Sequence, residues 1–253
     1  MNLFAPKEIA PATTVRRPEP SEPPIVPGAD IGAAYSSERM GGDFFDFILV
    51  NNRLVFLMLD VSGQRENAQN IAAIVQDHFR AEVPRLFDLP QLNAATAIVE
   101  LTLSLNRTIL DAADGICASS SFLGTYDTEL GTVCYSNAGH VPGLVRDGAG
   151  ITQLPATGIP LGLFSHATHD ASITVLEPGA ALLLVSRGVI EARCQGNEFG
   201  VEGTAATLLH ANAPNAHRLC VAILDGVESY MCAPPTHNDV TALALVRATL
   251  TAS

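Results

Sequence analysis

Apolar residues in the first half of the chain follow two periodicities, one typical of strands and the other typical of helices. Short segments that alternate or run continuously apolar come first, and Asn51-Asn52 supplies a tight turn within them. Longer segments then repeat apolar residues at the i, i+3, i+4 and i+7 spacing of a helix buried on one side. The predicted strands are 29–36, 43–50 and 53–60, and the predicted helices are 64–87, with Ser62 as N-cap, and 92–113.

The second half of the chain returns to strand patterns, followed by two helical segments and a last apolar strand. A loop with proline, glycine and two histidines, 155–171, interrupts the strands. Because strands and helices come in blocks, the pattern predicts an α+β fold and not a series of βαβ units. The strands are predicted at 119–127, 131–136, 143–146, 151–154, 172–176, 180–186 and 240–248, and the helices at 201–211 and 216–229.

Two aspartates stand at the ends of neighbouring predicted strands. A glycine pair precedes Asp43, and six consecutive large apolar residues, typical of a strand buried on both faces, lead to Asp60. Two carboxylates brought together in this way would form the hard oxygen site that Mg²⁺ or Mn²⁺ prefers. The alternative is that Asp43 caps a turn and Asp60 caps the following helix.

Six motifs in order resemble the SpoIIE-type (RsbU-like) branch of the PPM metal-dependent serine/threonine protein phosphatases. The resemblance covers about residues 28–248. It implies an αββα four-layer sandwich, with two packed, mainly antiparallel sheets flanked by helices, as a phosphatase domain at 28–253. The motifs are Gly41-Gly42-Asp43-Phe44-Phe45-Asp46, Asp60-Val61-Ser62-Gly63, Asn137-Ala138-Gly139-His140, Gly158-Ile159-Pro160-Leu161-Gly162, the segment 182–192, and Asn238-Asp239-Val240-Thr241.

The resemblance implies a reaction in which two Mn²⁺ or Mg²⁺ ions polarise a phosphate and a bridging water attacks it. Asp60 would bridge the ions, the backbone carbonyl of Val61 would contribute a ligand, and Asp43 would support the water shell. Two further family carboxylates are replaced in this chain, by Arg187 and by Asn238.

These two replacements change the local charge by three units, two at Arg187 and one at Asn238, which exceeds the charge of one divalent ion. A guanidinium stays protonated, and at about 5 Å and an effective dielectric constant of ~20 it opposes a divalent ion by roughly 6–7 kcal/mol. We hypothesise that Arg187 replaces a cation by pairing with Asp60 and Asp43; alternatively it projects into solvent. Asp239 could replace the carboxylate that is lost at Asn238. In a strand, however, neighbouring side chains point to opposite faces, which directs Asp239 away from the position of Asn238.

The remaining polar candidates have simpler interpretations. Arg65 could bind phosphate at a helix N-terminus, or it could lie in a solvated first turn. His140 is expected to shape a tight turn between strands and not to act in catalysis. His166 and His169 are expected in a solvated loop, since the sequence offers no third ligand for a metal.

Composition narrows the class of protein further. The net charge of −12 argues against nucleic acid and anionic membrane as partners, and no apolar run approaches the ~20 residues of a membrane span. Five cysteines without a C-x-x-C pair predict reduced, buried thiols in a cytoplasmic protein and neither a disulfide nor a zinc framework. Residues 1–27 hold seven of the sixteen prolines and are expected to form a disordered or extended tail, without the apolar region of a signal peptide.

Three functions are compatible with these residues. The first is a regulatory protein, a pseudophosphatase, that binds a signalling partner with little or no hydrolysis. The second is an active phosphatase with an altered metal site, for which the resemblance implies a substrate such as a phosphorylated anti-sigma-factor antagonist. The third is a domain retained for dimerisation alone, and a homodimer is compatible with the other two as well.

Overall fold

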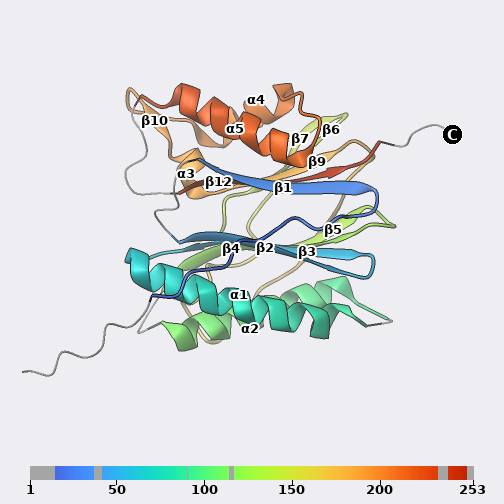
Figure 1. The fold of residues 1–253 in the computed structure, drawn as a ribbon, viewed down its shortest axis with the longest axis vertical. Helices are drawn as coiled ribbons and strands as arrows, with labels where there is room; N and C mark the ends of the chain where they lie inside the picture. Colours follow the sequence, from blue (N-terminus) through green and yellow to red (C-terminus); the bar gives the residue numbers. More distant parts are fainter. Residues whose placement is uncertain (1–14, 37–41, 90, 114–116, 233–238, 250–253) are drawn as a thin grey trace, which may run out of the picture.

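Two five-stranded antiparallel sheets pack face to face in this protein (Figure 1). The computed structural model describes residues 15–36, 42–89, 91–113, 117–232 and 239–249. One sheet has the order β1 (Ala29–Ser36), β12 (Val240–Arg247), β9 (Ala181–Val185), β6 (Gly143–Asp147), β7 (Gly150–Leu154). The other has the order β2 (Asp43–Val50), β3 (Arg53–Val61), β4 (Ser119–Asp127), β5 (Thr132–Ala138), β8 (Ser172–Val175).

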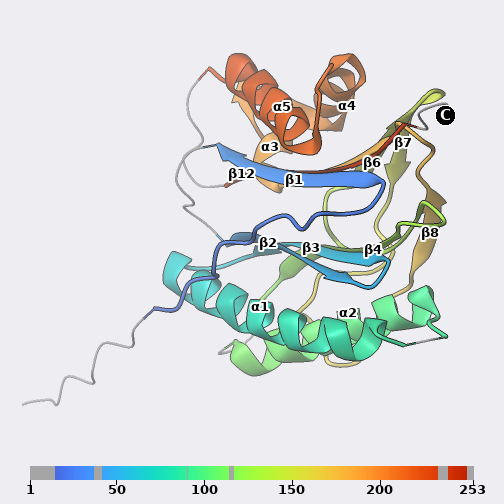
Figure 2. The same ribbon diagram turned by 45° about the vertical axis from the view of Figure 1, so that its right-hand side comes forward.

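Helices cover the outer face of each sheet and complete four layers (Figure 2). The helices α1 (Arg65–Phe87) and α2 (Ala94–Ala112) pack on the sheet that contains β2, while α4 (Gly200–His210) and α5 (Ala216–Tyr230) pack on the other. Three apolar clusters fill the spaces between successive layers. The predicted αββα sandwich of an α+β fold is confirmed.

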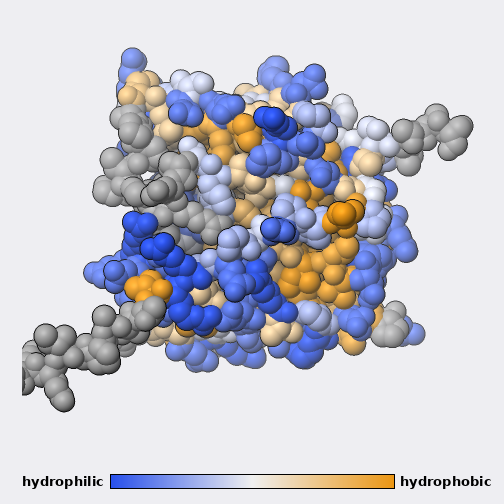
Figure 3. Space-filling view, viewed as in Figure 1, coloured by the Kyte–Doolittle hydropathy of each residue, from blue (hydrophilic) through white to orange (hydrophobic). Residues whose placement is uncertain are grey.

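Strand β3 shows why an uninterrupted apolar run is needed at the centre of this architecture. All six residues from Leu54 to Leu59 are buried. Leu54, Phe56 and Met58 face the cluster between the sheets, whereas the alternate residues face the cluster beneath α1 and α2. On the face shown in Figure 3, hydrophilic residues cover most of the surface over α1 and α2, and hydrophobic residues gather at the level of the sheets.

Several local features differ from the sequence-based predictions. A single helical turn, α3 (Arg187–Ile190), and a small hairpin of β10 (Arg193–Cys194) and β11 (Asn197–Glu198) were not expected. The N-cap of α1 is Gln64 and not Ser62, and it makes no side-chain capping bond. The prediction of reduced, buried thiols is correct for three cysteines but wrong for Cys194 and Cys232, which form a disulfide across 38 positions that sequence spacing does not reveal.

The described part of the predicted tail lies along α1. Residues 15–25 contain neither helix nor strand. Arg16 pairs with Asp77 at 2.7 Å, and Glu19 pairs with Arg80 at 2.6 Å. None of the helices in the described ranges combines the length and the apolar character that crossing a membrane requires.

Candidate functional site

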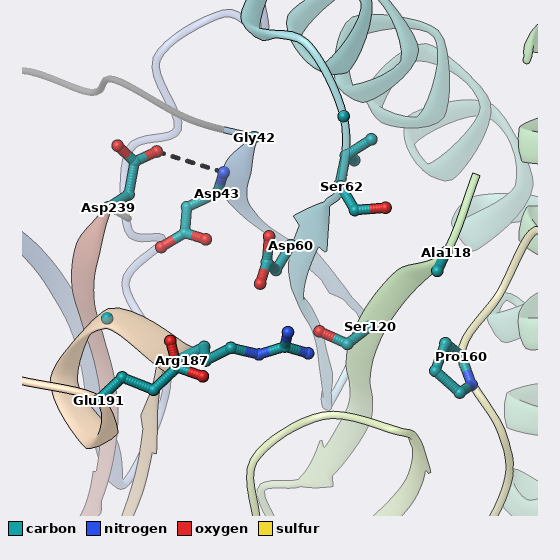
Figure 4. A pocket seen from close by; sticks show the side chains of 13 residues that line it. Gly42, Asp43, Asp60, Ser62, Ala118, Ser120, Pro160, Arg187, Glu191 and Asp239 are labelled. Atoms are coloured by element: carbon teal, nitrogen blue, oxygen red, sulfur yellow. Dashed lines mark hydrogen bonds between the residues drawn. The ribbon is translucent and has the colours of Figure 1, made fainter. Parts of the chain in front are cut away.

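Strand pairing brings the two predicted aspartates together. Asp43, the first residue of β2, stands directly opposite Asp60 near the end of β3, because the turn at Asn51-Asn52 sets this register. Both aspartates line a cavity of about 360 Å³ at the end of the sheets (Figure 4). The predicted juxtaposition of these two carboxylates is therefore confirmed.

The glycine before Asp43 allows two backbone segments to approach closely. The Val61 amide donates a hydrogen bond to the Gly42 carbonyl at 3.3 Å. A Cβ atom at position 42 would lie only 2.2 Å from the Val61 carbonyl oxygen. Any side chain at position 42 would displace this carbonyl, the atom that the family resemblance implies as a metal ligand.

Asp43 is held in a buried, polar environment. The Thr241 hydroxyl donates to its carboxylate at 2.8 Å, and the Asp43 amide donates to the Asp239 carboxylate at 3.3 Å. Burial raises the pKa of Asp43 well above its usual value, and the charges of Asp60 and Asp239 add to this, although the hydrogen bond from Thr241 lowers it. The ionised form of Asp43 therefore needs a nearby positive charge.

Arg187 supplies a positive charge from the neighbouring sheet. It begins α3, directly after β9, and its side chain extends across the pocket towards Ser120 and below Asp60 (Figure 4). Burial raises the pKa of Asp60, and the Arg187 charge opposes that increase. Within the described ranges no ion pair of 4 Å or less joins Arg187 to either aspartate, so the expected direct pairing is absent. Arg187 is exposed to solvent, as the alternative expects, but its side chain lines the pocket and does not point away from it.

Asp239 lines the same pocket, contrary to the expectation from strand alternation. Strand β12 begins only at Val240, so the alternating directions of a strand do not fix the side chain of the residue before it. The Ser186 hydroxyl donates to the Asp239 carbonyl at 2.8 Å and accepts from the Thr241 amide at 3.0 Å, which fixes this segment beside the end of β9. Asn238, the second replaced position, lies outside the described residues.

Sequence reasoning missed three side chains that line the pocket, Ser62, Ser120 and Glu191. The charge of Glu191 contributes to the raised pKa of Asp60. Glu191 could have been predicted from its place in the segment 182–192, where the resembling family carries V-x-E-A. Ser62 follows β3 within the motif Asp60-Val61-Ser62-Gly63 and was interpreted only as a helix cap. Ser120 lies near the start of β4, where the sequence gives no signal.

The structure places the candidate histidines in different environments. The His140 amide donates to the Asn137 side chain at 2.8 Å around Gly139, whose φ is 68°, so the predicted tight turn is confirmed. Burial lowers the pKa of His140 to about 4. His166 is exposed, but His169 is buried against Gly158, and the prediction of a solvated position is wrong for His169. Arg65 lies exposed in the first turn of α1.

The residues present do not fit the two-ion centre that the resemblance implies. In the described part of the chain, no group of three or more His, Cys, Asp or Glu side chains is arranged to hold a metal ion. Asp43, Asp60 and Asp239 share a pocket, but a guanidinium enters the same space. The geometry therefore supports no step that is routed through a pair of metal ions.

Two facing antiparallel sheets with outer helices are also the fold of solved PPM-type phosphatase structures. The family described as Stage II sporulation protein E (SpoIIE) matches residues 51–248. The chain belongs to this family, and its relatives place it in the RsbU-like branch.

Three relatives illustrate this similarity. Phosphoserine phosphatase RsbU from Bacillus subtilis is 24% identical over 169 residues, which are 66% of this chain and 48% of RsbU. The RsbU and RsbW domains of Rv1364c from Mycobacterium tuberculosis match with a TM-score of 0.71 and 28% identity, over 90% of this chain and 64% of that one. RsbX in complex with magnesium matches in fold, with a TM-score of 0.62 and 12% identity, over 89% and 98%. The chain thus spans about half the length of RsbU.

Proposed function

We propose that this chain is a regulatory protein with the SpoIIE-type phosphatase fold and with lost or strongly weakened metal-dependent phosphatase activity. It acts by binding a signalling partner. The observation that carries this proposal is the position of Arg187, whose side chain occupies the pocket beside Asp60.

Electrostatics supports this proposal. The charge of Arg187 opposes the increase that burial causes in the pKa of Asp60. A divalent ion would have to enter beside this fixed charge, with an arginine and an asparagine at two positions where the family supplies carboxylates. The pocket therefore contains its own cation, and a metal ion adds less stabilisation than it would in an active relative.

The proposed partner is a protein of the partner-switching type, such as a phosphorylated anti-sigma-factor antagonist. RsbU is named a phosphoserine phosphatase, and a similar mycobacterial chain combines RsbU and RsbW domains. The net charge of −12 favours a basic surface on the partner over nucleic acid or an anionic membrane. Recognition of a phosphorylated residue without its hydrolysis is compatible with this role, and so is a homodimer.

A second candidate is an active phosphatase with an altered site, and the position of Asp239 favours it. Asp239 lines the pocket together with Asp43 and Asp60. In this alternative the three carboxylates and the Val61 carbonyl would hold Mn²⁺ or Mg²⁺, which would activate water for attack on a phosphoserine or phosphothreonine. Arg187 would then have to turn away from the pocket.

Restoring the two family carboxylates tests the proposal. The double variant Arg187→Asp with Asn238→Asp should bind Mn²⁺ in calorimetric titration and hydrolyse p-nitrophenyl phosphate, while the unmodified chain does neither. Arg218→Asp makes the same two-unit charge change as Arg187→Asp, but on the exposed side of α5, and serves as the control, which should behave like the unmodified chain. Equal Mn²⁺ binding by the unmodified chain and the double variant would contradict the proposal.

A further inference from the structure

An accessible disulfide lies at one end of the sheet that contains β9. It joins Cys194, the last residue of β10, to Cys232, which follows α5. Their Cα atoms are 4.9 Å apart, although the residues are separated by 38 positions. Cys232 is exposed and Cys194 is half-buried, whereas the three free cysteines, Cys117, Cys134 and Cys220, are buried. A small thiol can therefore reach the bonded pair selectively.

Contacts other than the disulfide hold the same two segments together. The Cys232 amide donates to the Arg193 carbonyl at 3.4 Å, and the Tyr230 hydroxyl donates to the Glu198 carbonyl at 3.2 Å. The ring of Tyr230 also packs on the ring of Phe199, with centroids 5.2 Å apart. Because these contacts do not involve sulfur, they keep the two cysteines close after reduction and allow the bond to form again.

The disulfide fixes a stretch of chain that leads directly from the pocket. Upstream of Cys194, the turn α3 and the residue after it supply Arg187 and Glu191 to the pocket wall. The covalent bond therefore ties the chain that follows this wall to the end of α5, outside the pocket.

We propose that Cys194 and Cys232 form a redox-responsive modification site, which takes low-molecular-weight thiols and their disulfides and sets the rigidity of the pocket wall formed by α3. A thiolate such as that of glutathione attacks the exposed Cys232 sulfur, breaks its bond to Cys194 and releases the Cys194 thiolate, which takes up a proton. A second thiolate then attacks the mixed disulfide, so that two protein thiols and one small-molecule disulfide result. The reverse reaction, with glutathione disulfide as oxidant, restores the bond.

Amide hydrogen exchange on oxidised and reduced protein tests this inference without any assay of phosphatase activity. Reduction should expose two additional alkylatable thiols, identified by mass spectrometry as Cys194 and Cys232. It should also accelerate exchange in segment 187–192 by about tenfold, while α2, on the far sheet, keeps its protection. The double variant Cys194→Ser with Cys232→Ser should exchange at the reduced rate under both conditions.

Two variants separate a specific effect from general destabilisation. Cys134→Ala removes a buried thiol that takes no part in the bond, and this variant should retain the full difference between oxidised and reduced protein. Cys232→Ser alone should reproduce the reduced state if the double variant fails to fold. Equal exchange of segment 187–192 in oxidised and reduced protein would overturn the inference, and so would free Cys194 and Cys232 thiols in protein equilibrated with glutathione disulfide.

Discussion

Because Gly42 lies close to Val61, the direction of the stability change in Gly42→Ala tests the structure. Replacing glycine by alanine at a compatible position stabilises a protein by about 0.4–1 kcal/mol, because the unfolded chain loses freedom. At position 42 the new Cβ would lie 2.2 Å from the Val61 carbonyl oxygen and 3.0 Å from the Val61 carbonyl carbon. We therefore expect Gly42→Ala to destabilise the protein.

The magnitude follows from the displacement that the new contact requires. A carbon and an oxygen atom need about 3.2 Å or more, so the carbonyl or the β2 backbone must move by roughly 1 Å. Both contacting groups are backbone, and Val61 belongs to β3, which pairs with strands on both sides. Overpacking of this kind costs about 1–3 kcal/mol. At 2–4 °C per kcal/mol, the melting temperature of Gly42→Ala should fall by about 2–12 °C.

Urea unfolding followed by circular dichroism measures this change, and Gly148→Ala is the matched control. Gly148 lies in the turn between β6 and β7 and has no atom within 4 Å of an added Cβ, so that its replacement should be neutral or slightly stabilising. If Gly42→Ala were as stable as Gly148→Ala, the Val61 carbonyl could not lie where the structure places it, and the geometry of the pocket would have to be revised.

Further predictions concern buried groups outside the pocket. Arg80→Met should destabilise the protein by about 2 kcal/mol in urea unfolding, because it removes a 2.7 Å ion pair from the buried Asp46 carboxylate. The pKa of His140 is about 4 in the folded protein. As the pH falls below about 6.5, the unfolded chain therefore binds a proton at this residue before the folded protein does. Between pH 7 and 5 the wild type should therefore lose about 2 kcal/mol more unfolding free energy than His140→Gln. Burial raises the pKa of Cys220 to about 12, so iodoacetamide at pH 8 should leave it unmodified until the protein unfolds.

Each of these predictions has its own control. Arg85→Met removes an exposed pair with Glu82 and should leave the stability nearly unchanged; an equal loss in both arginine variants would argue against a special role for the buried carboxylate. A wild type whose stability follows pH in parallel with His140→Gln would show that His140 is protonated in the folded state. Cys134, whose pKa burial raises to about 11, should resist alkylation together with Cys220.

The fold was predictable from the sequence because its central elements have strong local signals. The continuous run from Leu54 to Leu59 requires burial on both faces, and the turn at Asn51-Asn52 sets a register that places Asp43 opposite Asp60. Both signals lie within one hairpin, so that no long-range contact has to be guessed.

The wall of the pocket opposite this hairpin was harder to predict because it depends on contacts between distant segments. The single turn of α3 is too short for a periodic pattern, and its position across the pocket from the end of β3 follows from the packing of two sheets. Asp239 was expected to point away because the alternation of strand side chains was applied to it, although it precedes both the predicted strand and β12, which begin at Val240. The disulfide of Cys194 and Cys232 likewise joins elements whose proximity arises only in the folded chain.

The central claim, that Arg187 supplies the cation that a metal ion supplies in active relatives, is tested most directly by calorimetric titration of the unmodified chain with Mn²⁺. Turnover of p-nitrophenyl phosphate should be measured in the same buffer. The account predicts neither binding heat nor turnover, together with a melting temperature that is insensitive to a chelator. Tight Mn²⁺ binding with turnover would contradict it and would identify an active phosphatase in which Asp239 replaces a lost ligand.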